Sequence, residues 1–300
     1  MDIQKRLDSA TQIIGVIGHP IKHSYSPLMH NSAFALDGLN YIYLPFDVHT
    51  SNLKSALKGM VALGIKGFNV TIPHKEKIIE MMHNISEEAA VVGAVNTIVN
   101  ENGSLNGYNT DVNGITETLL PFKDELADAT VSVIGAGGAS RAVIYSLIRY
   151  FKVGKINIIN RTVQKAESLK EYFSVKMHFE DFSAIELTPP DIVETLKSSK
   201  LIVNTTSIGM FPDIDDSPTT IEESFNENQI VFDIIYTPLN TKFLKIAESR
   251  GAIILNGLRM FVEQGARSYE IWTGQKMSVD PVYHTLLANL ESDQNKITGS

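Results

Sequence analysis

The stretch Val131-Ser-Val-Ile-Gly-Ala-Gly-Gly-Ala-Ser-Arg141 decides the fold of this 300-residue chain. Val131–Ile134 predicts a buried strand, Gly135 and Gly137 permit a tight turn, and apolar side chains then recur at helical spacing. Strand, glycine turn and helix form the unit that binds dinucleotides, because main-chain amides at the helix N-terminus can approach a pyrophosphate. Ser140 replaces the third glycine of the usual pattern, and a residue this small still permits close packing. The predicted cofactor residues of the turn are Gly135, Ala136, Gly137, Gly138 and Ala139.

The end of the next predicted strand, Lys155–Ile159, indicates which dinucleotide is bound. A unit specific for NAD usually carries an acidic residue here, which binds the ribose 2′-hydroxyl. This chain instead has Asn160-Arg161-Thr162, and Lys165 follows. A guanidinium can bind a 2′-phosphate with two parallel hydrogen bonds, so the sequence favours NADP over NAD. The alternative is an ordinary solvated helix start.

Composition bounds the class of protein. A hydrophobic content of 43% allows a large core, and 300 residues suggest about two domains. The net charge of −8, without a basic cluster, argues against nucleic acid and for a small-molecule substrate. The chain has no cysteine, no run long enough for a membrane helix and no apolar leader at Met1. We therefore expect a soluble, cytoplasmic protein without membrane contact, either a monomer or a homodimer.

Alternating strand-like and helical runs predict two α/β domains, the second built on a doubly wound parallel (Rossmann) sheet. We expect a substrate domain over residues 1–112, completed by helices within 258–291, a cofactor domain over 113–257 and a frayed tail over 292–300. In the first domain the predicted strands are Ile13–Ile17, Tyr41–Phe46 and Gly67–Ile72, with a hairpin of Val95–Asn100 and Ser104–Tyr108, and the predicted helices are Pro27–Leu36, Ser51–Leu63, Lys75–His83 and Ser86–Val92. In the second domain the predicted strands lie near Val131, Ile156, Val175, Leu201, Ile230 and Ile253.

Two charged residues of the first domain suggest acid–base chemistry. Lys75 is predicted at a helix start, where the helix dipole disfavours a cation. This unfavourable position suggests that Lys75 has a functional role. Asp111 opens the helix that leads out of the domain, where an acid can also serve simply as an N-cap. A lysine and a carboxylate on loops that face a cleft between domains form a candidate catalytic pair.

Seven segments in order resemble the shikimate dehydrogenase family. They are Ser24-Tyr-Ser-Pro27 with His30, Gly67-Phe-Asn-Val-Thr-Ile-Pro-His-Lys75, Gly93-Ala-Val-Asn-Thr97, Asn109-Thr-Asp111, Gly135-Ala-Gly-Gly-Ala139, Asn160-Arg-Thr162 and Gly257–Gln264. Together they span nearly the whole chain. The resemblance implies NADP-dependent reduction of 3-dehydroshikimate to shikimate, a step toward chorismate and the aromatic amino acids.

The family's site residues transfer to matching positions. Lys75 would give a proton to the substrate carbonyl, and Asp111 would orient the ammonium and the substrate. Ser24 and Ser26 would hold the substrate carboxylate, with Tyr236 closing over it. The residues expected to bind ring hydroxyls are Asn69, Thr71, Asn96, Asp111 and Gln264. Thr205 and Gly257 complete the expected cofactor residues.

Alternatives remain open. A quinate/shikimate dehydrogenase with relaxed substrate or NAD use would share these motifs, although such relatives tend to have an acid in the Asn160-Arg161 segment. A non-catalytic NADP-binding sensor would keep the fold and lose part of the serine pair or of Lys75 and Asp111. Arg259 stands where many relatives have a small residue, and Lys165 where an arginine is common. His19, His23 and His30 lack carboxylates at metal-ligand spacing, so we expect no metal.

Overall fold

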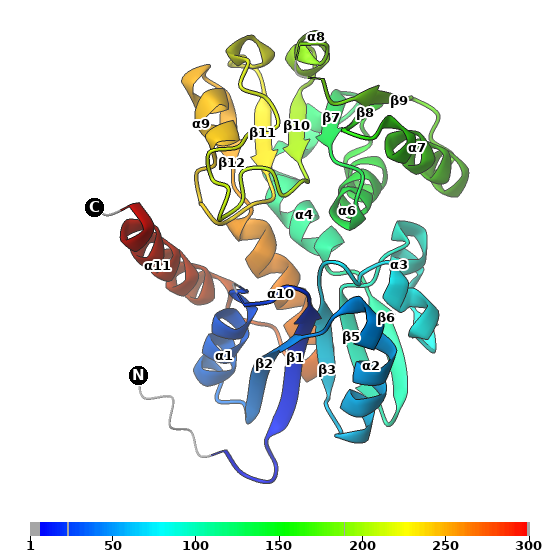
Figure 1. Ribbon diagram of the computed structural model, residues 1–300, viewed down its shortest axis with the longest axis vertical. Helices are drawn as coiled ribbons and strands as arrows, with labels where there is room; N and C mark the ends of the chain where they lie inside the picture. The colour runs from blue at the N-terminus through cyan, green and yellow to red at the C-terminus, as the bar shows by residue number, and fades with distance from the viewer. Residues whose placement is uncertain (1–6, 23, 189, 299–300) are drawn as a thin grey trace. The chain divides into compact units, whose positions relative to one another are not determined.

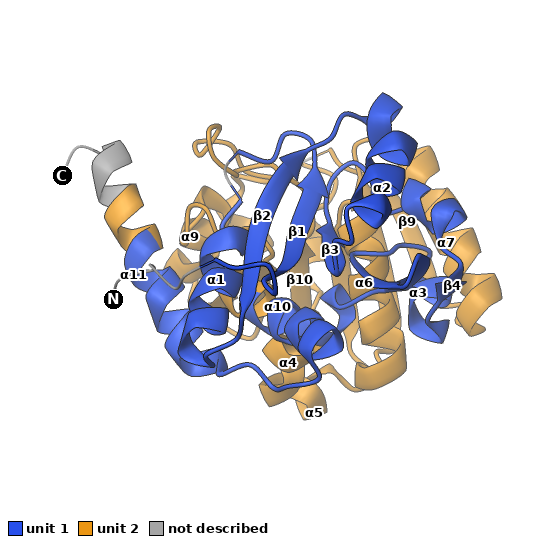
Figure 2. Ribbon diagram, turned by 90° about the horizontal axis from the view of Figure 1, so that it is seen from below, with its two compact units in different colours: residues 1–114, 262–289 blue, residues 115–261, 290–300 orange. Residues whose placement is uncertain are grey.

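The computed structural model describes residues 7–22, 24–188 and 190–298, with the side chains described as far as residue 293. His23, one of the histidines weighed above as a metal ligand, lies outside the described residues. The chain divides into two compact units, residues 1–114 with 262–289 and residues 115–261 with 290–300 (Figures 1 and 2). The chain passes from one unit to the other within helices α4 (Asp111–Leu119) and α10 (Leu258–Thr273).

The first unit is built on a six-stranded mixed sheet in the order β2-β1-β3-β5-β6-β4. Its strands are β1 (Gln12–Gly18), β2 (Tyr41–Asp47), β3 (Gly67–Val70), β4 (Asn84–Ile85), β5 (Thr97–Glu101) and β6 (Ser104–Tyr108). β1 pairs in parallel with β2 and β3, whereas β5 and β6 form the antiparallel hairpin that the sequence predicts. The helices of this unit are α1 (Ser26–Leu36), α2 (Leu53–Ala62), α3 (Glu87–Val92) and most of α10 and of α11 (Val279–Thr298). Parallel strands end at one sheet edge, so the segments after β1 and β3 lie together there.

The second unit is the predicted doubly wound parallel sheet. Its order is β12-β11-β10-β7-β8-β9, and every pair is parallel. The strands are β7 (Thr130–Ile134), β8 (Lys155–Asn160), β9 (Phe182–Glu186), β10 (Leu201–Asn204), β11 (Ile230–Asp233) and β12 (Ile253–Leu255). The helices are α5 (Lys123–Leu126), α6 (Gly138–Ser146), α7 (Val163–Met177), α8 (Val193–Lys197) and α9 (Lys242–Ser249). The order reverses between β7 and β10, and in such folds ligands bind at this reversal, beyond the carboxyl ends of the strands.

Two predicted elements are wrong. The strand near Val175 lies instead in α7, where Ala166, Leu169 and Phe173 form the buried face and Val175 is 73% exposed. Helical spacing of the buried residues therefore outweighs the β-branched side chain, and the third strand of the unit is β9.

The helix predicted from Lys75 to His83 is a short 3₁₀ segment, Lys77–Met81, so Lys75 lies in the turn before it. The predicted strand Gly67–Ile72 is also shorter in the structure. β3 ends at Val70, close before Pro73, which has no N–H to donate to a neighbouring strand.

The C-terminal helix α11 continues to Thr298, whereas the sequence suggested a frayed tail from residue 292. Residues 292–298 contain no proline or glycine, and Gly299, outside the described residues, is the first helix breaker after them. Within the described part of the chain, no helix combines the length and the apolar character needed to cross a membrane.

Candidate active site

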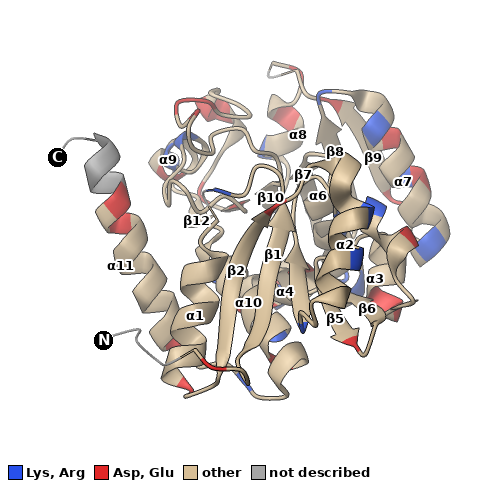
Figure 3. Cartoon of the chain, turned by 60° about the horizontal axis from the view of Figure 1, so that its bottom comes forward, with Lys and Arg blue, Asp and Glu red and all other residues tan. Residues whose placement is uncertain are grey.

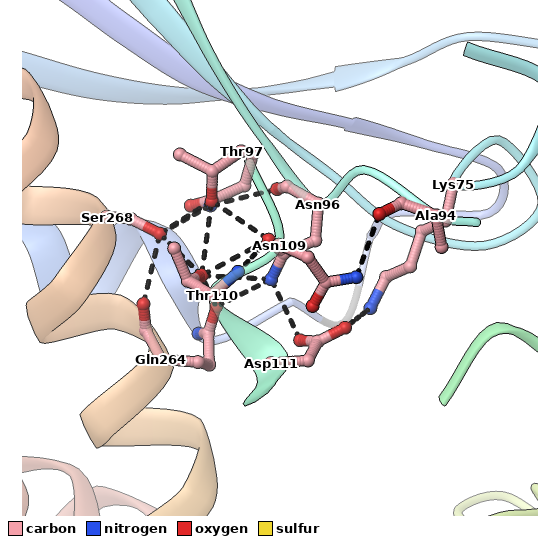
Figure 4. Close-up of polar contacts among 10 residues, drawn as sticks. Lys75, Ala94, Asn96, Thr97, Asn109, Thr110, Asp111, Gln264 and Ser268 are labelled. Carbon is pink, nitrogen blue, oxygen red and sulfur yellow. Dashed lines mark hydrogen bonds and ion pairs between the residues drawn. The ribbon is translucent and has the colours of Figure 1, made fainter. Parts of the chain in front are cut away.

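Lys75 and Asp111 form an ion pair in the first unit (Figure 4). Lys75 Nζ lies 2.6 Å from Asp111 Oδ2, and the two side chains are 18% and 7% exposed. The other carboxylate oxygen, Asp111 Oδ1, accepts a hydrogen bond of 2.8 Å from Asn96 Nδ2. Both oxygens of Asp111 thus accept from side chains of other segments. This pairing goes beyond an N-cap role and leaves the lysine ammonium partly exposed beside a fixed carboxylate.

Main-chain contacts hold both residues in place. The carbonyl of Lys75 accepts from Val95 N at 2.8 Å, which ties the turn after β3 to the segment before β5. Asn109 Nδ2 donates to the Ala94 carbonyl at 2.9 Å, so the start of α4 is tied to the same segment. Asp111 is the first residue of α4, and the positive end of the helix dipole favours its negative charge. The segment 93–97 is therefore the common support of the pair.

Asn96 connects the ion pair to a buried polar cluster, which we define as Asn69, Asn96, Thr97, Thr110, Gln264 and Ser268. Figure 4 labels all of these residues except Asn69. Asn96 Oδ1 accepts from Thr110 N at 2.7 Å, and Asn96 Nδ2 lies 3.5 Å from Gln264 Oε1. Three predicted site residues, Asn69, Asn96 and Gln264, thus meet beside the pair. A network of satisfied polar groups in a low-dielectric interior holds its members in one arrangement.

Ser268 is the hub of the polar cluster and was missed from the sequence. Its Oγ lies 3.0 Å from Asn69 Nδ2, 2.8 Å from Thr97 Oγ1 and 3.0 Å from Thr110 Oγ1, and it donates to the Gln264 carbonyl at 3.0 Å. The signal that could have found it is its position four residues after Gln264, on the same helix face. Thr97 and Thr110 lie within the motifs quoted above, but no role was predicted for them.

The predicted serine pair and Thr71 lie on segments that leave the same edge of the first sheet. Ser24 Oγ accepts a hydrogen bond from Ser26 N at 3.3 Å. Ser26 is the first residue of α1, and Pro27 follows it in the first turn. Thr71 follows β3, and its amide donates to the Ile17 carbonyl of β1. The hydrogen bonds of the described residues bring the two serines together and leave them outside the polar cluster.

His74 and His30 are buried histidines of the same unit. His74 Nε2 lies 2.6 Å from the Val48 carbonyl, so this side chain fastens the turn before Lys75. The His30 ring stacks on Tyr43, with centroids 4.4 Å apart, and burial lowers the pKa of His30 to about 3, which the side chain of Asn69 partly opposes. His30 is therefore a neutral core residue near neutral pH. Among the described residues no group of three or more His, Cys, Asp or Glu is placed to hold a metal ion.

In the second unit, the glycine turn connects β7 to α6. Gly135 has φ of 114°, and a Cβ there would lie 2.4 Å from Thr205 Oγ1, so only glycine fits. A Cβ at Gly137 would meet no atom within 4 Å, and the first-turn amides of α6 begin at this open position. Ser140 is fully buried and donates to the Gly137 carbonyl at 2.6 Å. The serine thus packs like the missing glycine and also braces the turn.

The segment predicted to bind the adenosine ribose lies at the carboxyl end of β8. Asn160 Nδ2 donates to the Thr162 carbonyl at 2.8 Å, which shapes the turn into α7. Arg161, Thr162 and Lys165 are exposed. In Figure 3 both charge signs alternate along α7, whereas β1 has no charged residue. Arg161 and Lys165 therefore lie on a surface that carries both charge signs. The end of β8 itself has no carboxylate.

Three further predicted residues lie in the second unit. Tyr236 stacks its ring on Phe261, with centroids 4.5 Å apart. Thr205 donates its hydroxyl to the Ile134 carbonyl at 2.7 Å, at the base of the glycine turn. A Cβ at Gly257 would lie 1.9 Å from the Ile234 carbonyl oxygen, so the two chain segments approach as closely as glycine allows.

A Rossmann-like dinucleotide-binding sheet, joined to an α/β unit with a partly buried lysine–carboxylate pair, defines a nicotinamide-dependent oxidoreductase. Three family models match the chain: a shikimate dehydrogenase substrate binding domain over residues 16–98, a shikimate/quinate 5-dehydrogenase over 118–232 and a shikimate 5′-dehydrogenase C-terminal domain over 257–287. The chain belongs to the shikimate dehydrogenase family.

Similar proteins of this family match over their full length. A shikimate dehydrogenase (NADP+) of Caldanaerobacter subterraneus subsp. tengcongensis is 44% identical over 94% of this chain and 98% of its own. A crystal structure of a shikimate dehydrogenase in complex with NADP+ has a TM-score of 0.87 at 40% identity, covering 95% of this chain and 97% of that one. A quinate dehydrogenase from Corynebacterium glutamicum in complex with NAD has a TM-score of 0.84 at 27% identity, covering 93% and 99%.

Proposed function

We propose that this protein is an NADP-dependent shikimate dehydrogenase, which reversibly reduces 3-dehydroshikimate to shikimate on the route to chorismate and the aromatic amino acids. The observation that carries the proposal is the Lys75–Asp111 pair, at 2.6 Å, set against the buried polar cluster. The relatives named above, and the NADP+ bound to one of them, support the choice of substrate and cofactor.

In this mechanism NADPH, when bound, supplies the hydride that adds to the carbonyl carbon. Lys75 Nζ donates a proton to the carbonyl oxygen, which becomes the new hydroxyl, and the amine recovers a proton from water. Asp111 orients the ammonium through its 2.6 Å contact, and Asn96 fixes the carboxylate in turn. The reverse reaction uses the neutral amine as the base. Positioning of this kind supplies much of an enzyme's rate acceleration.

Substrate recognition in the proposal combines hydroxyl and amide groups. Ser24 and Ser26 donate to the substrate carboxylate, and we assign Tyr236 to substrate binding as well. Hydroxyls of the ring are bound by Asn69, Thr71, Asn96, Asp111 and Gln264. Several of these groups already bond to one another in the polar cluster, so each has one fixed orientation. A site built this way discriminates strongly against analogues that lack a hydroxyl, because buried donors and acceptors would lose their partners.

The residues of the second unit fit NADP in this proposal. The open position at Gly137 leaves room for a pyrophosphate at the N-terminus of α6, where amides and the helix dipole favour an anion. Gly135, Ala136, Gly138 and Ala139 form the rest of that turn. Asn160, Arg161, Thr162 and Lys165 would bind the adenosine end with its 2′-phosphate. Thr205 and Gly257 would complete the cofactor site.

We assign substrate binding to residues 1–112 with 258–291 and cofactor binding to residues 113–257. A chain without cysteine suits a reducing compartment, so we place the reaction in the cytoplasm. The oligomeric state, monomer or homodimer, is measured by sedimentation or light scattering.

The second candidate is a quinate/shikimate dehydrogenase, favoured by the likeness to the quinate dehydrogenase structure. Initial rates with shikimate and with quinate, each with NADP+ and NAD+, separate the two. The proposal expects shikimate with NADP+ to be fastest. Quinate as the better substrate supports the second candidate. NADP+ binding without oxidation of either substrate overturns both and indicates a sensor.

A further inference from the structure

Asp233 is a buried carboxylate that the proposed mechanism does not use. It ends β11, between β10 and β12 in the second sheet (Figure 1), and is 0% exposed. The four adjacent strands β7, β10, β11 and β12 contain no other ionisable residue. A buried charge without a counter-charge costs free energy, so its presence requires a compensating use of its oxygens.

The carboxylate of Asp233 gathers donors from three segments. Oδ1 accepts from Asn204 Nδ2 at 3.1 Å and from Ile235 N at 3.1 Å. Oδ2 accepts from Thr241 Oγ1 at 2.7 Å, and Thr241 caps α9 through Leu244 N. These groups, which face Asp233 from β10, from its own segment and from α9, are all uncharged.

Two of these segments carry residues of the proposed site. Asn204, held by Asp233, accepts through Oδ1 from Thr206 N at 3.0 Å and Thr206 Oγ1 at 2.7 Å, which shapes the loop containing Thr205. Ile235, whose amide Asp233 binds, directly precedes Tyr236. One carboxylate therefore bonds to the residue next to Tyr236 and, through Asn204, to both sides of Thr205.

We infer that Asp233 is a positioning residue: its carboxylate fixes the segments that present Thr205 and Tyr236, an inference that rests on the roles proposed above for these two residues. A carboxylate suits this task because both oxygens only accept, and all three partners donate. An amide or a protonated acid carries a donor on one side and cannot accept all three bonds in the same geometry.

Burial raises the pKa of Asp233 to about 6, although Thr241, Ile235 and Asn204 oppose the shift. The acceptor-only form is therefore complete above that pH and is lost as the pH falls below it. Wild-type KM for 3-dehydroshikimate should rise as the pH drops from 7.5 to 5.5.

The test uses the full chain with Asp233→Asn, which keeps the shape and removes the charge. We expect KM for 3-dehydroshikimate to rise roughly tenfold, the scale of one lost buried hydrogen bond, and to lose its dependence on pH near 6. Ser132→Ala is the matched control. It removes a 2.7 Å buried hydrogen bond to Ser199 in the same sheet and should lower thermal stability without moving KM or its pH profile.

A double-mutant cycle with Tyr236→Ala tests the route of the effect. If Asp233 acts through Tyr236, Asp233→Asn adds much less to the KM of Tyr236→Ala than to that of the wild type. Unchanged KM and pH profile in Asp233→Asn, or additive effects in the cycle, overturn the inference. If Asp233→Asn does not fold, the pH profile of KM in Tyr236→Ala decides: it should be flat near pH 6, and a wild-type profile contradicts the inference. A wild type that does not reduce 3-dehydroshikimate refutes the proposed function instead.

Discussion

Replacing Ser268 by alanine removes the hydroxyl at the hub of the polar cluster. The hydroxyl lies within 3.0 Å of Asn69 Nδ2, Thr97 Oγ1 and Thr110 Oγ1. A buried group left without a partner costs about 1–3 kcal/mol. Asn69 Nδ2 keeps the Asn96 carbonyl at 3.2 Å, so part of the loss is compensated. We therefore expect the free energy of unfolding to fall by about 2 kcal/mol.

The same change should loosen Asn69, Asn96 and Gln264, the groups proposed to bind ring hydroxyls. We expect kcat/KM for 3-dehydroshikimate to fall about tenfold, with NADPH binding unchanged. Urea unfolding measures the stability, and steady-state kinetics with fluorescence titration of NADPH measures the rest. Thr285→Ala is the control: its hydroxyl also donates to the carbonyl four residues earlier, at 2.9 Å, on an exposed face. A Ser268→Ala enzyme with the wild-type kcat/KM would show that Ser268 does not hold the groups proposed to bind the ring hydroxyls.

Three further predictions concern single residues. Arg161→Ala should raise KM for NADPH about tenfold and leave KM for 3-dehydroshikimate unchanged, and equal effects on both would argue against a 2′-phosphate site. Gly137→Ala should fold normally, because a Cβ there meets no atom within 4 Å, yet bind NADPH at least tenfold more weakly, and unchanged binding would place the pyrophosphate elsewhere. Because the pKa of His30 is lowered to about 3, its stabilising contribution is complete above about pH 6.5 and falls by up to about 1.4 kcal/mol per pH unit below that. The raised pKa of Asp233 changes stability in the opposite direction below about pH 6. The change in unfolding free energy between pH 7 and pH 5, measured with urea, is therefore compared between the wild type and His30→Asn. An equal pH dependence in these two proteins would contradict the assignment of His30 as a neutral buried residue.

The second unit was largely predictable from sequence, because its strands are continuous apolar runs and its glycine turn marks the start of the sheet. Gly135 shows why the signal is strong: with φ of 114° and Thr205 against it, no other residue fits. The error at Val175 has a physical cause as well. A single β-branched residue on the exposed face of α7 resembles a strand locally, and the buried Ala166, Leu169 and Phe173 decide the outcome.

The candidate site was predictable only in part. Lys75 and Asp111 were found from a charge mismatch and a helix start, although Lys75 precedes a 3₁₀ segment, so the dipole argument applied to a helix that does not form. Ser268 could not be found in the same way, because its spacing of four residues from Gln264 places it on the same helix face but does not show which groups it contacts. Its role depends on contacts 158 or more residues away in the chain, with Asn69, Thr97 and Thr110, which only the tertiary fold brings together.

The most direct test of the central claim is single-turnover reduction of 3-dehydroshikimate by Lys75→Ala, measured with NADPH already bound. We predict that NADPH binds with the wild-type dissociation constant while the rate of hydride transfer falls by about 10²–10⁴-fold, the range expected for a lost general acid. A rate within a few fold of wild type would contradict the assignment of Lys75 as the proton donor.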